Sequence, residues 1–349
     1  ISDEKKNKTA RITGVRGKDG DDLAKLLLEK NYRVVGAVRR ASTLNLPRLS
    51  ALKIDRDVEL QTLDVQDLTN IVRIIETVAP DEIYNLSGQS SPQASFQQPL
   101  HTGETSGLGT LRLLEAIRLM KAPARFYQAS SSEVFGHAQG ATQNEQTDFQ
   151  PRSPYGVAKL YAHWMVINYR EAYEMHASSG ILFSHESPLR GMDFVTRKIT
   201  TTLAQIACGS QEMLQLGNVD NARDWGFAGD YVVAMWLMLQ QEEADDFIIA
   251  SGQTHTVRDF VDRAAAAMGF NLVWEGAGIE TKGMDAKTGR QIVGVSEDFY
   301  RPSEPDPMVG DARKAREVLG WEPTQSFGAL VEMMAEHDLA RARDGNMWF

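Results

Sequence analysis

Short apolar runs alternate with longer amphipathic segments along the first half of the chain. A short apolar run bounded by turn residues is typical of a buried strand, and apolar residues at helical spacing are typical of an amphipathic helix. The pattern predicts strands at residues 10–13, 32–38, 58–63, 82–86, 125–130 and 177–183, and helices at 21–30, 68–78, 108–120 and 154–173. This alternation predicts an α/β fold whose core is a doubly wound parallel sheet of the Rossmann type.

The pattern changes near residue 184, after which prolines and glycines interrupt the chain more often. Helical patterns recur at residues 195–209, 231–241, 257–269, 312–319 and 327–343. We therefore predict a Rossmann domain over residues 1–184, to which some later segments return, and a smaller C-terminal substrate-binding lobe formed mainly by residues 185–349. The glycine-rich segment 275–294 is predicted to be a surface loop with little core of its own.

Composition and charge narrow the classes of function. The chain has 37 basic and 47 acidic residues, a net charge of −10, which argues against bulk binding of nucleic acid. Its sequence has no run of about 18 apolar residues that could cross a membrane. The single Cys208, at a predicted helix end, cannot form an intrachain disulfide, so we expect a reducing, cytoplasmic environment. We expect no metal site.

A glycine-rich turn follows the first predicted strand. Gly14, Gly17 and Gly20 have the spacing G-x-x-G-x-x-G between that strand and the first predicted helix. Glycines at such a turn let the backbone approach a pyrophosphate, which then binds at the helix N-terminus. The alternative is a plain glycine turn, but the strand before it and the helix after it favour a dinucleotide site.

The ends of the next strands indicate which cofactor binds. Arg39 and Arg40 follow the second strand, where an enzyme specific for NAD usually has an acidic residue. Two guanidinium groups favour a 2′-phosphate and hence NADP, although a solvated arginine pair is the alternative. Asp64 follows the third strand, where it can bind the adenine amine. The residues predicted to bind the cofactor here are Gly14, Gly17, Lys18, Asp19, Gly20, Arg39, Arg40, Asp64, Val65, Leu86, Ser87 and Gly88.

Four polar residues form a candidate catalytic group. Tyr155 and Lys159 lie four residues apart and therefore on one helical face. A buried lysine ammonium near the tyrosine hydroxyl stabilises the phenolate, so Tyr155 can act as a base near neutral pH. Ser131 lies at the end of the fifth strand, where its hydroxyl can bind the reacting sugar oxygen. A chance Y-x-x-x-K match is common, but the order of the glycine turn, Ser131, Tyr155 and Lys159 is that of the short-chain dehydrogenases.

Glu133 follows the serine run and distinguishes between reactions. A carboxylate at this place can remove a proton alpha to a ketone and help to expel water, which simple reductases and 4-epimerases do not need. The alternative is a charge near a helix N-cap.

The chain resembles the GDP-mannose 4,6-dehydratase family over essentially its full length. The stretches that carry the resemblance are residues 126–133, 151–161, 180–188, 194–198, 223–226 and 300–304. The resemblance implies an NADP-dependent hydro-lyase that converts GDP-D-mannose to GDP-4-dehydro-6-deoxy-D-mannose, the first step toward deoxyhexoses such as fucose or rhamnose. It also implies that Tyr155 takes the C4 hydroxyl proton and that Glu133 acts at C5 and C6. The competing hypotheses are reductase or epimerase activity on a related GDP-sugar and a non-catalytic NADP-binding regulator.

The resemblance implies further binding residues. His185 and Arg190 match cofactor contacts of the family. The positions that match contacts of the GDP-sugar are Ser184, Lys198, Arg223, Arg301 and Glu304. The family has Thr at position 131, Asn at position 184 and Gln at position 18, so three of these sites depart from its pattern. The arginine-rich segment 39–48 lies across a subunit boundary in relatives, which implies a homotetramer, with a dimer as the alternative.

Overall fold

The computed structural model describes residues 7–40, 46–137, 142–299 and 308–345. The chain divides into two compact units, each built from three segments. The first unit contains Ile1–Phe183, Ala228–Ile249 and Asp311–Glu322, and the second contains Ser184–Phe227, Ala250–Gly310 and Pro323–Phe349. Two later segments thus belong to the first unit. That the first of these units binds the cofactor and the second binds the substrate stays a prediction.

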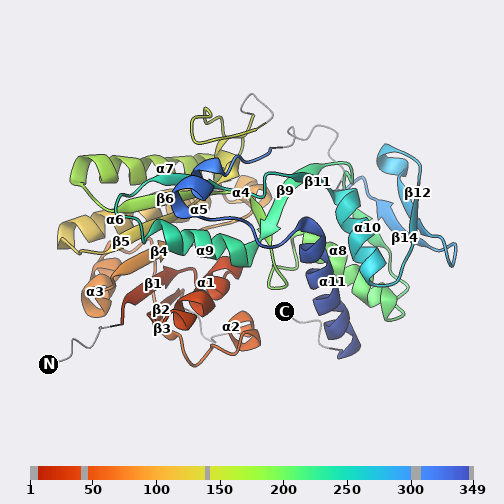
Figure 1. Ribbon diagram of the computed structural model, residues 1–349, viewed down its shortest axis with the longest axis horizontal. Helices are drawn as coiled ribbons and strands as arrows, with labels where there is room; N and C mark the ends of the chain where they lie inside the picture. Colours follow the sequence, from red (N-terminus) through yellow and green to blue (C-terminus); the bar gives the residue numbers. More distant parts are fainter. Residues whose placement is uncertain (1–6, 41–45, 138–141, 300–307, 346–349) are drawn as a thin grey trace. The chain divides into compact units, whose positions relative to one another are not determined.

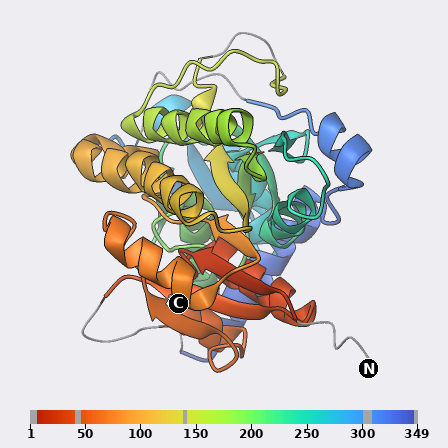
Figure 2. The same ribbon diagram turned by 90° about the vertical axis from the view of Figure 1, so that its left-hand side faces the viewer.

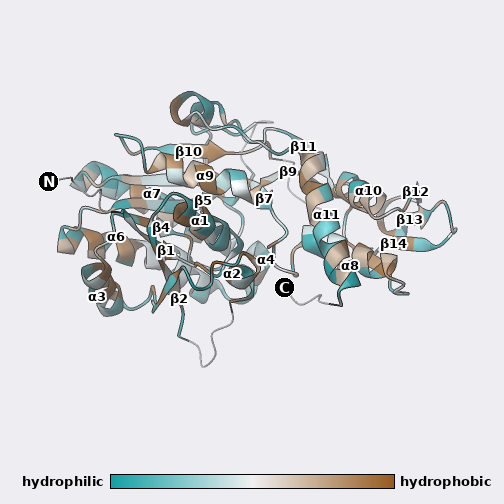
Figure 3. Ribbon diagram, turned by 60° about the horizontal axis from the view of Figure 1, so that its bottom comes forward, coloured by the Kyte–Doolittle hydropathy of each residue, from teal (hydrophilic) through white to brown (hydrophobic). Residues whose placement is uncertain are grey.

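A parallel seven-stranded sheet forms the centre of the first unit, in the order β10-β6-β5-β4-β1-β2-β3 (Figure 1). Its strands are β1 (Thr9–Thr13), β2 (Arg33–Val38), β3 (Glu59–Thr62), β4 (Glu82–Asn85), β5 (Arg125–Ser131), β6 (Ala177–Leu182) and β10 (Asp246–Ile249). Apolar residues run along β2 and β10 (Figure 3), as expected for strands covered on both faces. The predicted α/β fold with a doubly wound Rossmann sheet is confirmed.

Helices cover both faces of this sheet (Figure 2). Its helices are α1 (Lys18–Glu29), α2 (Pro47–Ala51), α3 (Leu68–Val78), α4 (Pro92–Gln97), α5 (Pro99–Thr102), α6 (Gly109–Met120), α7 (Pro154–Tyr173) and α9 (Ala228–Met238), with short helical turns η1 (Gly103–Leu108), η2 (Ser132–Val134) and η4 (Ala315–Leu319). Helices α1 and α9 pack together in one core, and α3, α6 and α7 contribute to another. Val34 belongs to the first core and its neighbour Val35 to the second, because successive strand residues point to opposite faces.

The second unit contains two small sheets and three long helices. Its sheets have the orders β11-β9-β7 and β12-β13-β14-β8. The elements are β7 (Ser184–Glu186), α8 (Val195–Ala207), β8 (Leu214–Leu216), β9 (Ala222–Phe227), β11 (Thr254–Thr256), α10 (Val257–Ala267), β12 (Leu272–Glu275), η3 (Gly278–Glu280), β13 (Lys282–Asp285), β14 (Gln291–Val295) and α11 (Phe327–Arg343). Helix α11 packs against both α8 and α10 in one apolar core.

The prediction of a surface loop over residues 275–294 is wrong. The segment forms most of a β-hairpin, β13 and β14, and β14 pairs in parallel with the distant β8. Ile292 and Val293 are buried in the core of the second unit. Gly283 lies close to Val293, since a Cβ at position 283 would be 3.0 Å from the valine Cβ. The glycines of this segment therefore permit close strand pairing and tight turns instead of marking an unstructured loop.

Two further findings concern the described part of the chain. Within it, no helix combines the length and apolar character that crossing a bilayer requires, and no group of three His, Cys, Asp or Glu residues is arranged to hold a metal ion. Cys208 is exposed, at the C-terminal end of α8.

Candidate active site

The glycine turn between β1 and α1 has the geometry of a phosphate cradle. Gly14 has a φ of +73°, and a Cβ at this position would lie 2.7 Å from the carbonyl oxygen of Leu86. A Cβ at Gly20 would lie 2.4 Å from the carbonyl oxygen of Gly14, so both positions require glycine. Gly17 is the N-cap of α1 and, as a glycine, provides no side-chain hydrogen bond to the first turn. The N–H groups of the first helical turn are therefore placed to bind an anion.

A buried polar network supports this turn and was not predicted from the sequence. The Thr13 hydroxyl donates to Asn85 Oδ1 at 2.6 Å and accepts the backbone N–H groups of Leu86 and Ser87 at 3.1 and 3.2 Å. Asn85 also donates to Gln128 Oε1 at 2.7 Å. The network holds the backbone at the carboxyl end of β4, where Leu86 and Ser87 are predicted to meet the cofactor. The signal was a polar residue within or at the end of each otherwise apolar strand: Thr13, Asn85 and Gln128.

Helix α2 is tied to the glycine turn of its own chain. Arg48 Nη1 donates to the carbonyl oxygen of Arg16 at 2.9 Å, and Arg48 Nε lies 4.0 Å from Asp21 Oδ2. Asp21 is fully buried, and burial raises the pKa of its carboxyl to about 8. Lys18 is also buried and forms an ion pair with its neighbour Asp19. The predicted positive charge of Lys18 beside the phosphates is therefore partly balanced within the turn itself.

The residues that follow β2 and β3 lie at one edge of the sheet, because these two strands are paired. Arg39 and Arg40 are exposed, and so is Asp64, whose carboxylate accepts the Gln66 N–H at 2.9 Å. Val65 is buried and contacts Gly109 of α6. The two guanidinium groups are therefore available to an anionic ligand at the carboxyl edge of the sheet, where ligands of this fold bind.

Helix α7 presents Tyr155 and Lys159 from a well-defined N-terminus. The Ser153 hydroxyl caps the helix by accepting the N–H of Gly156 at 3.0 Å. Tyr155 and Lys159 are both buried, and Lys159 Nζ lies 5.7 Å from the centre of the tyrosine ring. Lys159 Nζ also donates to the carbonyl oxygen of Ala129 in β5 at 2.7 Å. The ammonium is thus held between the helix and the end of the strand.

Ser131 and Glu133 lie beside the first turn of α7. The Ser131 hydroxyl oxygen accepts the N–H of Glu133 at 3.3 Å, which starts the short helix η2. A Cβ at Gly156 would lie 2.7 Å from the carbonyl oxygen of Glu133, so this glycine allows α7 to approach Glu133 closely. Segments of the chain that are 20 to 30 residues apart thus place all four predicted catalytic residues around the carboxyl end of β5.

Burial changes the acidity of Lys159. It lowers the pKa of the ammonium to about 8, while the nearby Asp19 carboxylate opposes this shift. The folded protein binds this proton more weakly than the unfolded chain, so the contribution of Lys159 to the free energy of unfolding increases as the pH rises above about 8. Near neutral pH the side chain is mostly charged. It can therefore stabilise a phenolate at Tyr155.

The second unit contains the other predicted binding residues. Ser184 and the buried His185 belong to β7, which pairs in parallel with β9. Arg223 lies on β9 and donates to the carbonyl oxygen of Ala222 at 2.9 Å. Lys198 on α8 lies over the ring of Phe299 at 3.8 Å, and burial lowers the pKa of its ammonium. Arg301 and Glu304, also predicted to bind the GDP-sugar, lie outside the described residues.

Arg190 lies in the loop between β7 and α8. Its Nε is 3.2 Å from Glu186 Oε2, and its guanidinium lies 3.5 Å from the centre of the Phe194 ring. The same carboxylate oxygen of Glu186 accepts the Thr196 hydroxyl at 2.8 Å. These partners were not anticipated from the sequence. They hold Arg190 in one orientation.

Comparison with known proteins identifies the family. The model of the family "GDP-mannose 4,6 dehydratase" matches residues 12–334. The GDP-mannose 4,6-dehydratase of Sinorhizobium fredii (strain HH103) is 50% identical over 96% of this chain and 98% of that protein. The chain belongs to the GDP-mannose 4,6-dehydratase family. Another relative, the GDP-mannose 4,6 dehydratase of Homo sapiens, is 47% identical over 97% of this chain and 93% of its own.

Solved structures share the fold of this GDP-mannose 4,6-dehydratase family member at low sequence identity. The dTDP-glucose 4,6-dehydratase of Bacillus anthracis in complex with NAD is 17% identical, with a TM-score of 0.78 and coverage of 98% of both chains. RMD from Pseudomonas aeruginosa complexed with NADPH is 19% identical, with a TM-score of 0.74, and covers 96% of this chain and all of its own.

Proposed function

We propose that this protein is a GDP-D-mannose 4,6-dehydratase that forms GDP-4-dehydro-6-deoxy-D-mannose and water, with NADP as its cofactor. The observation that carries the proposal is the position of Glu133 next to the helical turn that contains Tyr155. A reductase or epimerase has no need of a carboxylate at this place, whereas a dehydratase needs a base for the C5 proton and an acid for the departing hydroxyl.

The reaction requires four proton transfers. Tyr155, as a phenolate stabilised by Lys159, takes the C4 hydroxyl proton, and the Ser131 hydroxyl donates a hydrogen bond to the developing C4 carbonyl oxygen. When bound, NADP would supply the hydride acceptor for C4 and the hydride donor for C6, so that no outside oxidant or reductant is needed. Glu133 removes the C5 proton, which the new ketone has made acidic, and protonates the C6 hydroxyl as it leaves as water. A proton then returns to C5 as the hydride reaches C6.

The residues present fit such a cofactor and substrate. The glycine turn at the start of α1 and the exposed Arg39 and Arg40 suit a dinucleotide with a 2′-phosphate. His185 and Arg190 are proposed as further contacts of the cofactor. The residues proposed to bind the GDP-sugar are Ser184, Lys198, Arg223, Arg301 and Glu304, in which three cations match a diphosphate.

Proton NMR of the reaction in deuterated water tests the proposal directly. A dehydratase will convert GDP-mannose into a sugar with a new C6 methyl signal and deuterium at C5, with no net change in NADPH. A reductase would consume NADPH in proportion to product, and an epimerase would give no methyl signal. Unchanged GDP-mannose in the presence of bound cofactor would overturn the proposal.

Removal of the arginine pair should abolish the preference for NADP. The double substitution Arg39→Ala and Arg40→Ala removes two charge-assisted contacts with a 2′-phosphate, so we expect the Kd for NADPH to rise about a hundredfold while that for NADH changes little. Fluorescence titration with both nucleotides measures this. Arg73→Ala, which removes an exposed arginine of α3, is the control. Equal losses for NADPH and NADH would contradict a 2′-phosphate contact.

We propose a homotetramer, with a dimer as the alternative, and an apolar stripe on α7 supports self-association. Val157, Tyr161 and Trp164 follow one another at helical spacing and are 55%, 38% and 52% exposed. Exposed apolar patches on helices mark association surfaces. Trp164→Glu should therefore shift the mass measured by light scattering to a smaller species, whereas Val273→Glu on β12 should not. An unchanged mass would exclude this stripe from the interface. A cytoplasmic location stays a prediction.

A further inference from the structure

Arg197 is the largest fully buried side chain among the described residues. Polar groups, described below, surround its guanidinium group. It stands in the first turn of α8, where the helix dipole disfavours a positive charge. Its Nε and Nη2 donate to the two carboxylate oxygens of Asp338 on α11, at 3.0 and 2.9 Å. The Thr200 hydroxyl donates to the same carboxylate at 2.5 Å.

The remaining terminal nitrogen of Arg197 holds the loop between β7 and α8. Its Nη1 donates to the carbonyl oxygens of Pro188 and Arg190, at 2.7 and 2.8 Å. The loop is also closed on itself, since the Arg190 N–H donates to the carbonyl oxygen of Ser187 at 3.0 Å. The backbone on both sides of Leu189 is therefore fixed by one guanidinium group, which is itself fixed by Asp338.

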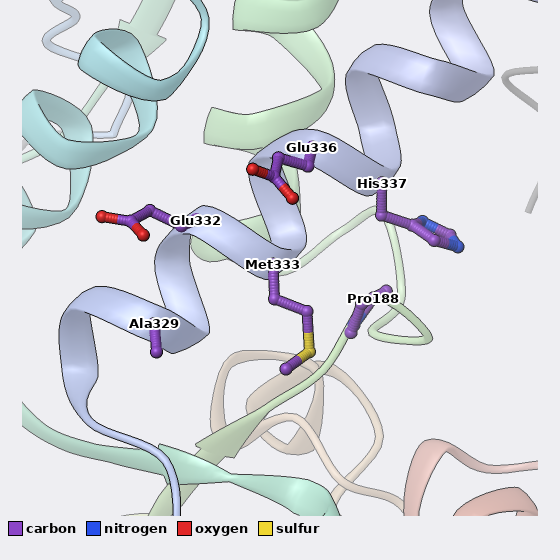
Figure 4. Close-up of a pocket in the computed structure, with 6 residues that line it drawn as sticks. All are labelled: Pro188, Ala329, Glu332, Met333, Glu336 and His337. Carbon is purple, nitrogen blue, oxygen red and sulfur yellow. The ribbon is translucent and has the colours of Figure 1, made fainter.

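Helix α11 supports the loop through a second contact surface. A shallow pocket between them is lined by Pro188, Ala329, Glu332, Met333, Glu336 and His337. Figure 4 shows the Met333 side chain extending toward Pro188, while the polar ends of Glu332, Glu336 and His337 point away from one another. These polar groups therefore do not converge on a common point where they could bind a ligand together. The pocket is better explained as the place where α11 packs against the loop.

The buried ion pair joins α8, α11 and the loop between β7 and α8, and its burial costs free energy. Removing two charges from water costs free energy that their mutual attraction often only balances, and well-packed apolar residues of similar volume usually stabilise a fold as well or better. What apolar residues cannot do is bind two specific carbonyl oxygens of a loop. The arrangement thus favours a role in shaping the loop over a role in stability alone.

We propose that Arg197 and Asp338 are positioning residues that hold Arg190 in the conformation that binds the cofactor. The inference rests on the proposed contact between Arg190 and the cofactor. The pair fixes the backbone of Arg190, while Glu186 and Phe194 orient its side chain. Asp338 on α11 thereby contributes to the affinity for the nucleotide through its effect on Arg190.

A double-mutant cycle on NADPH affinity tests this role. Arg190→Ala should raise the Kd for NADPH about tenfold, the effect of losing one charge-assisted hydrogen bond. Asp338→Asn should raise it about three- to tenfold in the otherwise unchanged protein, but by less than about twofold when Arg190 is already Ala. Glu186→Gln, which leaves the Arg197–Asp338 pair intact, should act in the same direction. That variant tests how the Arg190 side chain is oriented. If Asp338→Asn fails to fold, Arg197→Lys decides the question by the same comparison, because it keeps the charge beside Asp338 but cannot bind both loop carbonyl oxygens as the guanidinium does.

Val331→Ala is the matched control on α11, because it removes buried apolar volume and no hydrogen-bonding group. It should lower the Tm and leave the Kd unchanged. Equal effects of Asp338→Asn with and without Arg190, or an unchanged Kd in Asp338→Asn or in Arg197→Lys, would overturn the positioning role alone. An unchanged Kd in Arg190→Ala would instead overturn the proposed cofactor contact, and the inference with it.

Discussion

Replacement of Glu133 by Gln is expected to reduce the formation of the 4-dehydro-6-deoxy sugar by about a thousandfold or more. The amide keeps the size of the side chain but can neither accept the C5 proton nor protonate the departing C6 hydroxyl. One residue serves in both steps, so its loss should exceed that of a group that transfers a single proton. The rate is measured by the appearance of the C6 methyl signal of the product.

The same variant separates the two halves of the reaction. Oxidation at C4 depends on Tyr155 and Lys159 and should persist in Glu133→Gln, visible as a small absorbance of NADPH when GDP-mannose is added. Exchange of the C5 hydrogen with deuterated water should be lost. Glu171→Gln, an exposed substitution on the same α7, should leave both signals unchanged. Full C5 exchange in Glu133→Gln would assign the base to another residue.

Residues that cap helix N-termini explain why three helices were predicted with both ends correct. Helices α3, α7 and α11 agree with prediction at both ends. Asp67, Ser153 and Ser326 each accept a backbone N–H at the start of one of these helices, so the boundary is set by residues next to it in sequence. Helix α1 begins three residues earlier than predicted, at Lys18, since its glycine cap has no such side chain.

Long-range pairing explains what could not be predicted. Strand β14 is defined by its pairing with β8, whose residues lie nearly 80 positions earlier, and no local periodicity reveals that partner. The candidate site shows the same division. Tyr155 and Lys159 are related by one helical turn and were found from their spacing and from their place after the glycine turn and Ser131. Arg197 and Asp338 are 141 residues apart, and neither the ion pair nor its two bonds to the loop has a local signature.

Replacement of Tyr155 by Phe is expected to reduce turnover by about a thousandfold or more, because without the hydroxyl no group at this place can take the C4 proton. Binding of NADPH and GDP-mannose should change little, since the ring still fills its buried position.

The activity of the unaltered protein should fall above about pH 8, where Lys159 loses the charge that stabilises the phenolate. Lys159→Arg retains a positive charge at every accessible pH, so its lower activity should lack this alkaline decline.

Comparison of these profiles tests the partnership of Tyr155 and Lys159 more strictly than loss of activity alone. A variant that merely distorted α7 would lower activity at all pH values and reduce the Tm, whereas loss of a titrating partner changes the shape of the profile. Tyr173→Phe, near the exposed end of the same helix, should reproduce the unaltered profile. An alkaline decline that persists unchanged in Lys159→Arg would show that another group titrates there. The hydroxyl of Tyr155 would then have to be activated without the lysine charge.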